Sequence, residues 1–252
     1  MRQTRLLFLG LLPVFGLLSC GDDTPTPIDE SGTATDEIVG GATFRGLPAV
    51  GALTYGGQFY CTGTLIGPRQ VVTAAHCVHS FSPVSRLHFV IGTEVTRPEA
   101  VLDVVATAAH PGYRPDRLAD DIGLVTLADD APVAPMPVLA RLAPSLVGTP
   151  LLFVGYGVND GLSHTGAGTK RATWIKVTKL DPRTFAYSDP VRNTCNGDSG
   201  GPAFARQADG SYALAGITSY GDTTCTVYGV DTRTDAYLDF LHLLPPPSEL
   251  DG

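Results

Sequence analysis

The stretch GDSGGP at residues 197–202 decides the fold of this chain. It sets Ser199 between glycines, where the backbone can approach a bound molecule closely and present the hydroxyl as a reactive oxygen. Clusters of glycine, serine and aspartate are otherwise typical of turns. Three further stretches precede this one, namely IVGG at 38–41, TAAHC at 73–77 and DDIGL at 120–124. A histidine, an aspartate and a serine therefore follow one another along the chain, each inside a distinctive local sequence.

Together the four stretches resemble the chymotrypsin/trypsin family of serine endopeptidases, over most of residues 38–252. The resemblance implies an all-β fold with two six-stranded antiparallel Greek-key β-barrels and a C-terminal α-helix. Barrel one would cover about 38–130, barrel two about 148–233, and the helix about 234–244. The sequence from Ile38 onward agrees, because short apolar runs separated by turn signals are typical of β-barrels.

Eleven apolar runs are candidate strands, and a stretch rich in proline and alanine at 129–148 is expected to connect the two barrels. Near the end, apolar residues recur at helical spacing up to Pro245, with Thr234 or Asp235 as a possible cap. The candidate strands lie at 49–55, 59–66, 70–75, 87–91, 102–108, 122–127, 151–155, 172–178, 201–205, 212–220 and 226–230.

The resemblance assigns a catalytic role to three of these residues. Ser199 would be the nucleophile, and because a serine hydroxyl is weakly reactive at neutral pH, it needs an adjacent base. His76 would be that base and would later protonate the leaving amine. In the mechanism known for the family, an aspartate orients the imidazole. Asp121 rather than Asp120 fits that role, because it directly precedes an Ile-x-Leu strand, and Asp120 is expected to be a solvated loop acid.

Two further roles follow from the resemblance. The backbone amides of Gly197 and Ser199 would form an oxyanion hole, which stabilises the negative charge of the transition state. Cleavage before Ile38 would free an ammonium group that pairs with the carboxylate of Asp198, so the uncut chain would be a zymogen. Two buried charges are tolerated only as a pair. The alternative is that residues 38–41 are merely a first strand.

The resemblance also locates a substrate pocket. Asn193 stands at its base, where trypsin-like enzymes carry an aspartate, so a strong preference for Lys or Arg is not expected and a large neutral or polar side chain is favoured. The alternative is that a loop rearrangement makes Asn193 irrelevant. An extended peptide would pair with the edge of residues 219–221. The predicted pocket residues are Asn193, Thr194, Ser219, Tyr220, Gly221 and Gly229.

The five cysteines include no CxxC pair, so a zinc site is not expected. The resemblance implies two disulfides, Cys61–Cys77 and Cys195–Cys225, which leave Cys20 unpaired. Residues 92–100 lack the length and paired acids of the family's calcium loop. No metal and no cofactor are therefore expected.

The first 20 residues have the design of a secretion signal, with two arginines before an apolar run that is short for a membrane span. The ending LLSC at 17–20 resembles the lipobox of bacterial lipoproteins, which predicts a lipid on Cys20. The alternative is a plain secretory signal with an incidental cysteine. Disulfides and a signal both indicate export to an oxidising compartment, in the cell envelope or outside the cell.

Residues 21–37 are polar and acidic and lack aromatic residues, which predicts a disordered tether and propeptide. They end in Glu37, so the activating cut would follow a glutamate. The pocket offers no clear cation for a glutamate, which favours an activating protease that acts in trans over self-cleavage. The formal net charge of −8 is ordinary, and no basic run suggests nucleic acid.

The sequence thus predicts a secreted or lipid-anchored serine endopeptidase that acts on protein or peptide substrates. One alternative is a non-catalytic, protease-like module for surface binding, although such relatives usually lose a member of the triad. A second is an esterase. Its usual Gly-x-Ser-x-Gly turn is matched only loosely here, and its catalytic acid precedes its histidine, unlike here.

Overall fold

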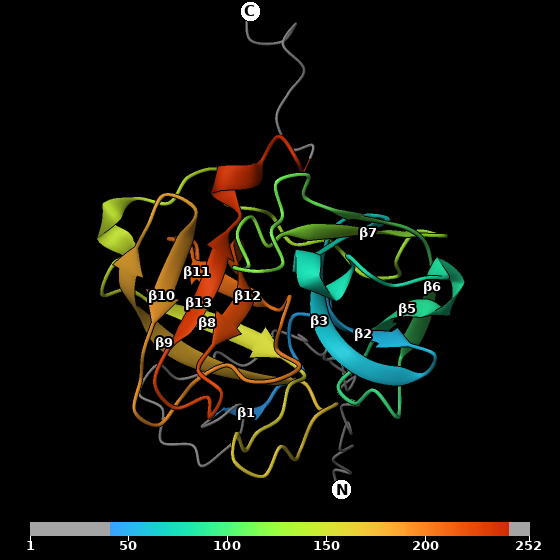
Figure 1. Ribbon diagram of the computed structural model, residues 1–252, viewed down its shortest axis with the longest axis horizontal. Coiled ribbons are helices and arrows are strands. Elements are labelled where there is room, and N and C mark those ends of the chain that lie inside the picture. The colour runs from blue at the N-terminus through green and yellow to red at the C-terminus, as the bar shows by residue number, and fades with distance from the viewer. Residues whose placement is uncertain (1–40, 242–252) are drawn as a thin grey trace, which may run out of the picture.

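The computed structural model describes residues 41–241. Two closed β-barrels lie side by side and make up most of this part of the chain (Figure 1). Each barrel has six antiparallel strands, which confirms the predicted fold class. The signal, the tether, Cys20 and Ile38 lie outside the described residues, as do residues 242–244 of the predicted helix. No helix within residues 41–241 is long and apolar enough to cross a membrane.

The first barrel is built from consecutive strands in the order β2-β3-β4-β7-β6-β5, and pairing between β2 and β5 closes it. Its interior is filled by buried branched and aromatic side chains, among them Leu53, Leu65 and Phe89. The strands are β2 (Val50–Tyr55), β3 (Gln58–Gly67), β4 (Gln70–Thr73), β5 (Leu87–Ile91), β6 (Ala100–Ala109) and β7 (Gly123–Leu127).

The second barrel has the order β9-β10-β13-β12-β11-β8, and pairing between β8 and β9 closes it. The short strand β1 (Ala42–Thr43) joins the start of β9 on the side away from β8. The strands of the barrel are β8 (Pro150–Gly155), β9 (Arg171–Leu180), β10 (Thr184–Tyr187), β11 (Pro202–Arg206), β12 (Tyr212–Gly221) and β13 (Gly229–Arg233).

Strand β8 shows why an uninterrupted apolar run forms a strand here. Successive side chains of a strand point to opposite faces. Leu151 and Phe153 point into the core of the second barrel, whereas Leu152 and Val154 pack into the cluster that contains the first barrel's core. Both faces of β8 are therefore buried, and the strand joins the two barrels into one hydrophobic unit.

The connection between the barrels runs over both of them. The amide of Met136 donates to the carbonyl of Leu65 in β3, and the amide of Leu214 in β12 donates to the carbonyl of Pro137, each at 2.8 Å. The connection contains only one short helical turn, η3 (Pro144–Leu146). A second such turn, η2 (Val84–Arg86), precedes β5.

Two strands of the second barrel differ from the sequence prediction. Strand β10 was not predicted, because its four residues are too few to show a clear pattern. Strand β13 was expected at 226–230 but begins at Gly229. The cause is Asp222, whose carboxylate accepts hydrogen bonds from the amides of Thr226, Val227 and Tyr228 and so holds that segment in turns.

The C-terminal segment is helical over a shorter stretch than the apolar spacing indicated. It forms the 3₁₀ turn η4 (Asp235–Tyr237) and then continues in turns to Leu241. Neither expected cap acts as one, because both side chains are bound elsewhere. The Thr234 hydroxyl donates to the carbonyl of Leu214, and the Asp235 carboxylate accepts from the amide of Leu142.

Candidate active site

His76 and Asp121 lie together at one edge of the first barrel. His76 is in the 3₁₀ turn η1 (Ala75–Cys77), just after β4, and Asp121 lies just before β7. Because β4 and β7 are paired neighbours, both residues emerge at the same edge. The imidazole Nδ1 is 2.8 Å from Oδ2 of Asp121, and the His76 amide donates to Oδ1 at 2.9 Å. This pairing fixes the ring and leaves Nε2 on its opposite side.

Asp121 is also held by the second barrel. The Ser219 hydroxyl in β12 donates to Oδ2 at 2.5 Å, and the Thr232 hydroxyl in β13 donates to the backbone carbonyl of Asp121 at 3.0 Å. The Asp121 residue has no exposed surface, whereas the His76 side chain is 26% exposed. The carboxylate is thus a buried, fixed acceptor, and the imidazole carries the only accessible face of the pair.

Ser199 is anchored beside this pair by its backbone. Its carbonyl accepts from the amide of Thr62 in β3 at 2.9 Å, and Sγ of Cys77, the residue after His76, lies 3.7 Å from the same oxygen. Within the described residues, no hydrogen bond joins Nε2 of His76 to Oγ of Ser199. In unliganded enzymes such bonds are commonly long and tighten on substrate binding.

Two backbone amides beside Ser199 are unused by the protein. In the part of the chain that the structure describes, the amides of Gly197 and Ser199 donate no hydrogen bond, although most backbone amides in folded proteins are paired. Gly197 has φ +97, and a Cβ there would lie 2.8 Å from the Phe59 ring. Only glycine suits this turn, and the two free donors suit a ligand oxygen that bears negative charge.

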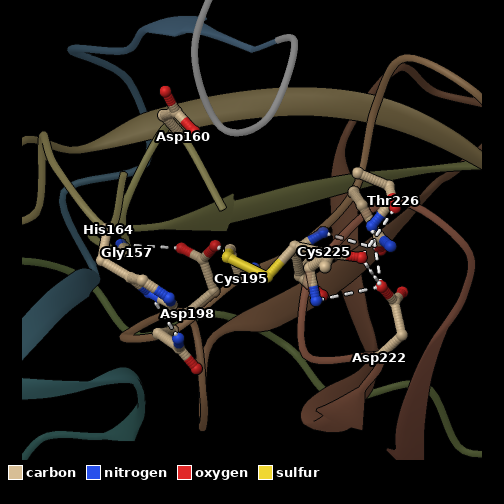
Figure 2. The surroundings of a disulfide bond; sticks show 12 residues. Gly157, Asp160, His164, Cys195, Asp198, Asp222, Cys225 and Thr226 are labelled. Carbon is tan, nitrogen blue, oxygen red and sulfur yellow. Dashed lines mark hydrogen bonds between the residues drawn. A yellow bond between two sulfur atoms is a disulfide. The ribbon is translucent and has the colours of Figure 1, made fainter. Parts of the chain in front are cut away.

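The Asp198 side chain is buried and its carboxylate faces Gly157 (Figure 2). Its carboxylate accepts from the amides of Gly157 and Cys195, each at 2.8 Å. A Cβ on Gly155 or Gly157 would collide with this carboxylate, so glycine at both positions leaves the space that the carboxylate occupies. Burial raises the pKa of Asp198 to about 6, against the lowering effect of the two amides and the charge of Arg171.

A pocket opens beside Ser199. Four predicted residues line it, namely Thr194, Ser219, Tyr220 and Gly221, together with Thr218 and Asp222. Two others lie behind its surface. Asn193 is buried and accepts from the amide of Thr194, and Gly229 packs against the ring of Tyr187.

Both disulfides implied by the resemblance are present. Cys61–Cys77 joins β3 to η1, and Cys195–Cys225 ties the segment before Ser199 to the far wall of the pocket (Figure 2). Among residues 41–241, the one cluster of possible metal ligands is Cys61, His76 and Cys77. Its two sulfurs are oxidised in the disulfide and offer no thiolate to a metal.

Other residues of the site were not foreseen. Thr232, Gly157 and Tyr187 have no motif around them, and only their positions in the folded barrel reveal them. Asp120, expected to be solvated, has a side chain only 11% exposed and binds Tyr237 and Arg183. It supports the loop and does not compete with Asp121 for the histidine.

Comparison with known proteins gives a consistent result. The family model described as Trypsin matches residues 38–241. The chain is 32% identical over 230 residues to the trypsin of Saccharopolyspora erythraea, covering 81% of this chain and 96% of that protein. It is 28% identical to serine protease 57 of Homo sapiens, with 86% of each chain covered. It is 30% identical to proproteinase E of Bos taurus, with 72% of this chain and 81% of that protein covered.

Proposed function

Because this chain belongs to the trypsin family and is a trypsin-like serine endopeptidase, we propose that it cleaves peptide bonds through an acyl-enzyme on Ser199. The Ser199 hydroxyl attacks the substrate carbonyl carbon, and Nε2 of His76 takes its proton. His76 then protonates the leaving amine as the carbon–nitrogen bond breaks. Water, activated by the same imidazole, releases the acid product and restores the serine.

The observation that carries this proposal is that residues of both barrels hold the Asp121 carboxylate by hydrogen bonds. This carboxylate is buried and accepts from His76 of one barrel and Ser219 of the other. A fixed, buried acceptor on Nδ1 keeps the proton there, stabilises the imidazolium and leaves Nε2 free as the base, as the family's mechanism requires. The unpaired amides of Gly197 and Ser199 would bind the oxyanion.

Substrate would bind as an extended peptide. The edge Ser219–Tyr220–Gly221 borders the pocket beside Ser199, so the backbone of a peptide can pair with it while one side chain enters the pocket. The protein would then act on protein or peptide substrates with accessible, unstructured segments.

Activation would follow a cut between Glu37 and Ile38 by a second protease. The new Ile38 ammonium would pair with the Asp198 carboxylate, which lies buried in a glycine-lined site. Burial raises the pKa of this carboxyl group, and a neighbouring cation would favour its charged form. Before the cut, Cys20 would carry a lipid and hold the exported zymogen at a membrane of the cell envelope.

A fluorophosphonate probe, which reacts with activated serines, tests the catalytic proposal. The processed wild-type chain should be labelled and should cleave casein or a peptide library. Ser199→Ala should lose both properties, whereas Ser211→Ala, at an exposed turn, should keep them. A processed, folded wild-type protein that is neither labelled nor active would favour the non-catalytic binding module. Labelling with turnover of esters alone would favour an esterase.

A further inference from the structure

A buried acid that the proposed mechanism does not use lies in the second barrel. Asp231 in β13 is opposite Thr218 of β12 and Phe185 of β10 in the strand register, and it has no exposed surface. Neither carboxylate oxygen makes a hydrogen bond of normal geometry. An unpaired buried carboxyl group is costly, so its presence calls for an explanation.

Asp231 lies directly behind the substrate pocket. The hydroxyls of Tyr187 and Thr218 lie close enough to influence its carboxylate, and the Tyr187 hydroxyl is 2.7 Å from that of Thr194. Thr194 and Thr218 both line the pocket. One hydroxyl, that of Thr218, therefore separates Asp231 from the pocket on one side, and the Tyr187–Thr194 pair separates it on the other.

The charges around the pocket favour a cation. Among the described residues that line it, the only charged side chain is the acid Asp222. Arg192, the nearest basic residue before the pocket segment, lines a different hollow with Trp174 and Lys176. A negatively charged side chain in the pocket would meet the acid Asp222, with no cation among the lining residues.

We propose that Asp231 is the specificity-determining acid of this pocket, so that the enzyme prefers Lys or Arg on the acyl side of the cleaved bond. This inference rests on the proposed peptidase function and names its substrate class. The hydroxyls of Thr194 and Thr218 would receive the cationic end of the substrate side chain, and Asp231 would neutralise its charge from behind. The acid thus replaces the one that Asn193 does not supply.

The energetics are consistent with this arrangement. Burial raises the pKa of Asp231 well above its usual value, and only the neighbouring hydroxyls oppose that effect. A substrate cation would offset the desolvation of the charged carboxylate and favour it. A neutral substrate side chain gains nothing from Asp231. A barrier to self-activation follows, because a pocket selective for cations would reject Glu37.

The test uses the full chain, cut after Glu37 by an added glutamate-specific protease that is then removed. Processed Ser199→Ala serves as the blank for residual activity. Peptides that differ only at the residue before the cleaved bond (Arg, Lys, Gln, Leu or Glu) give kcat/KM for each variant. Wild type should prefer Arg and Lys, and Asp231→Asn should lose about 30-fold or more on these two, with less than about threefold change on Leu and Gln.

Asp103→Asn is the matched control, because it removes the same charge from a side chain that is 78% exposed on the first barrel. It should keep the wild-type preference. A folded Asp231→Asn enzyme that still prefers Arg and Lys would overturn the inference. So would a wild-type enzyme that is labelled by fluorophosphonate and cleaves Leu or Gln peptides as well as Arg peptides. In that case the peptidase function would stand, whereas it would fail if no peptide is cleaved and no label is taken up.

A second measurement covers the possibility that Asp231→Asn does not fold. An aromatic amidine, which is a cation, should inhibit wild type at least about 30-fold more tightly than the neutral amide of the same shape. Thr218→Val, which keeps the volume and removes the hydroxyl, should reduce that ratio. Equal inhibition by amidine and amide, or an unchanged ratio in folded Thr218→Val, would overturn the inference.

Discussion

At the scale of single residues, the site depends on hydrogen bonds that cross between the barrels. Asp121 comes from the first barrel, but the Ser219 hydroxyl that donates to its Oδ2 atom comes from the second. The orientation of His76 therefore depends on how the two barrels pack. Two variants can measure this dependence. The Ser219 hydroxyl contacts the Asp121 carboxylate, whereas the Thr232 hydroxyl contacts the Asp121 backbone carbonyl.

Ser219→Ala should lower kcat by about 10- to 100-fold, because a hydrogen bond to a charged group contributes about 1.5–3 kcal/mol. KM should change little if the pocket is intact. Thr232→Val is the matched control and should cost less, since it removes a hydrogen bond to a neutral carbonyl. Steady-state kinetics on one peptide decide the matter, and an equal loss in both variants would contradict the orienting role of Ser219.

Asp198→Asn should remove a pH dependence of stability in the uncut chain. The folded state raises the pKa of Asp198 from 3.8 to about 6, which corresponds to about 3 kcal/mol. The folded chain then holds a proton that the unfolded chain releases, so this stabilisation is full below about pH 4 and is lost as pH rises through 6. Relative to wild type, Asp198→Asn should gain up to about 3 kcal/mol between pH 4 and 7.

Urea unfolding of the uncut chain in a Ser199→Ala background measures this difference. Asp130→Asn, which changes an exposed loop acid, should run parallel to its parent at every pH. After the cut, pairing with the Ile38 ammonium should lower the pKa of Asp198 and abolish the slope. Parallel curves for Asp198→Asn and its parent in the uncut chain would mean that the folded state leaves this acid unperturbed.

The motifs single out the proposed catalytic residues more readily than the residues that support them. GDSGGP and TAAHC are rare as sequences, so Ser199 and His76 could be singled out directly. Tyr187 and Asp231 stand in ordinary strand sequence, and their importance arises only where β10 and β13 pair behind the pocket. The same holds for Asp120, whose partners Tyr237 and Arg183 are more than 60 residues away.

At the scale of elements, one acid organises the wall of the pocket. The Asp222 carboxylate accepts from the Thr224 hydroxyl and from four amides in residues 224–228. Slight burial raises its pKa, but these hydrogen bonds prevail and hold the pKa well below the usual value. The segment is therefore ordered by its own loop, and Cys225 is presented to Cys195 from it.

Asp222→Ala should loosen this wall and raise KM for peptides by about tenfold, because several hydrogen bonds to one charged group are lost. The rate of fluorophosphonate labelling should change less, since the small probe does not need the pocket wall. Asp209→Ala, which breaks a similar turn at Ser211 on a distant loop, should leave KM unchanged. An unchanged KM in Asp222→Ala would show that the disulfide alone orders the wall.

The sequence predicted a strand correctly where an uninterrupted apolar run is buried on both faces. The run at 151–155 was recognised because both faces of β8 are apolar. The start of β13 was missed because Asp222 recruits the backbone of 226–228 into turns, and no apolar pattern reports such a contact. The C-terminal segment has helical spacing, but Thr234 and Asp235 bind β12 and the inter-barrel connection instead of the helix start.

At the scale of the whole molecule, the pairing of the cysteines decides whether the two barrels would stay linked to the N-terminal segment after the proposed cut. The two disulfides use Cys61, Cys77, Cys195 and Cys225, so Cys20 is the one cysteine left. No disulfide can then link the N-terminal segment to the barrels, and a cut after Glu37 should separate the barrels from the proposed lipid on Cys20.

Phase separation in a detergent that clouds on warming measures this release. The uncut chain expressed with its signal should enter the detergent phase, and the processed form that begins at Ile38 should move to the aqueous phase. Cys20→Ala should be aqueous from the start, whereas Ser19→Ala should behave like wild type. An active, processed enzyme that stays in the detergent phase would contradict the release.

The pairing of the short strand β1 with β9 would limit where the proposed activating cut can be. Thr43 pairs with Arg171, and Arg171 in turn pairs with Gly155, whose Cα borders the carboxylate of Asp198. From Ala42 back to Ile38 the chain can span at most about 14 Å, given the reach of an extended backbone. If activation follows the proposed route, the fixed position of β1 would therefore allow only an amino group freed at the right distance from it to reach Asp198. A cut misplaced by two or three residues would yield a protein that is severed yet still inert.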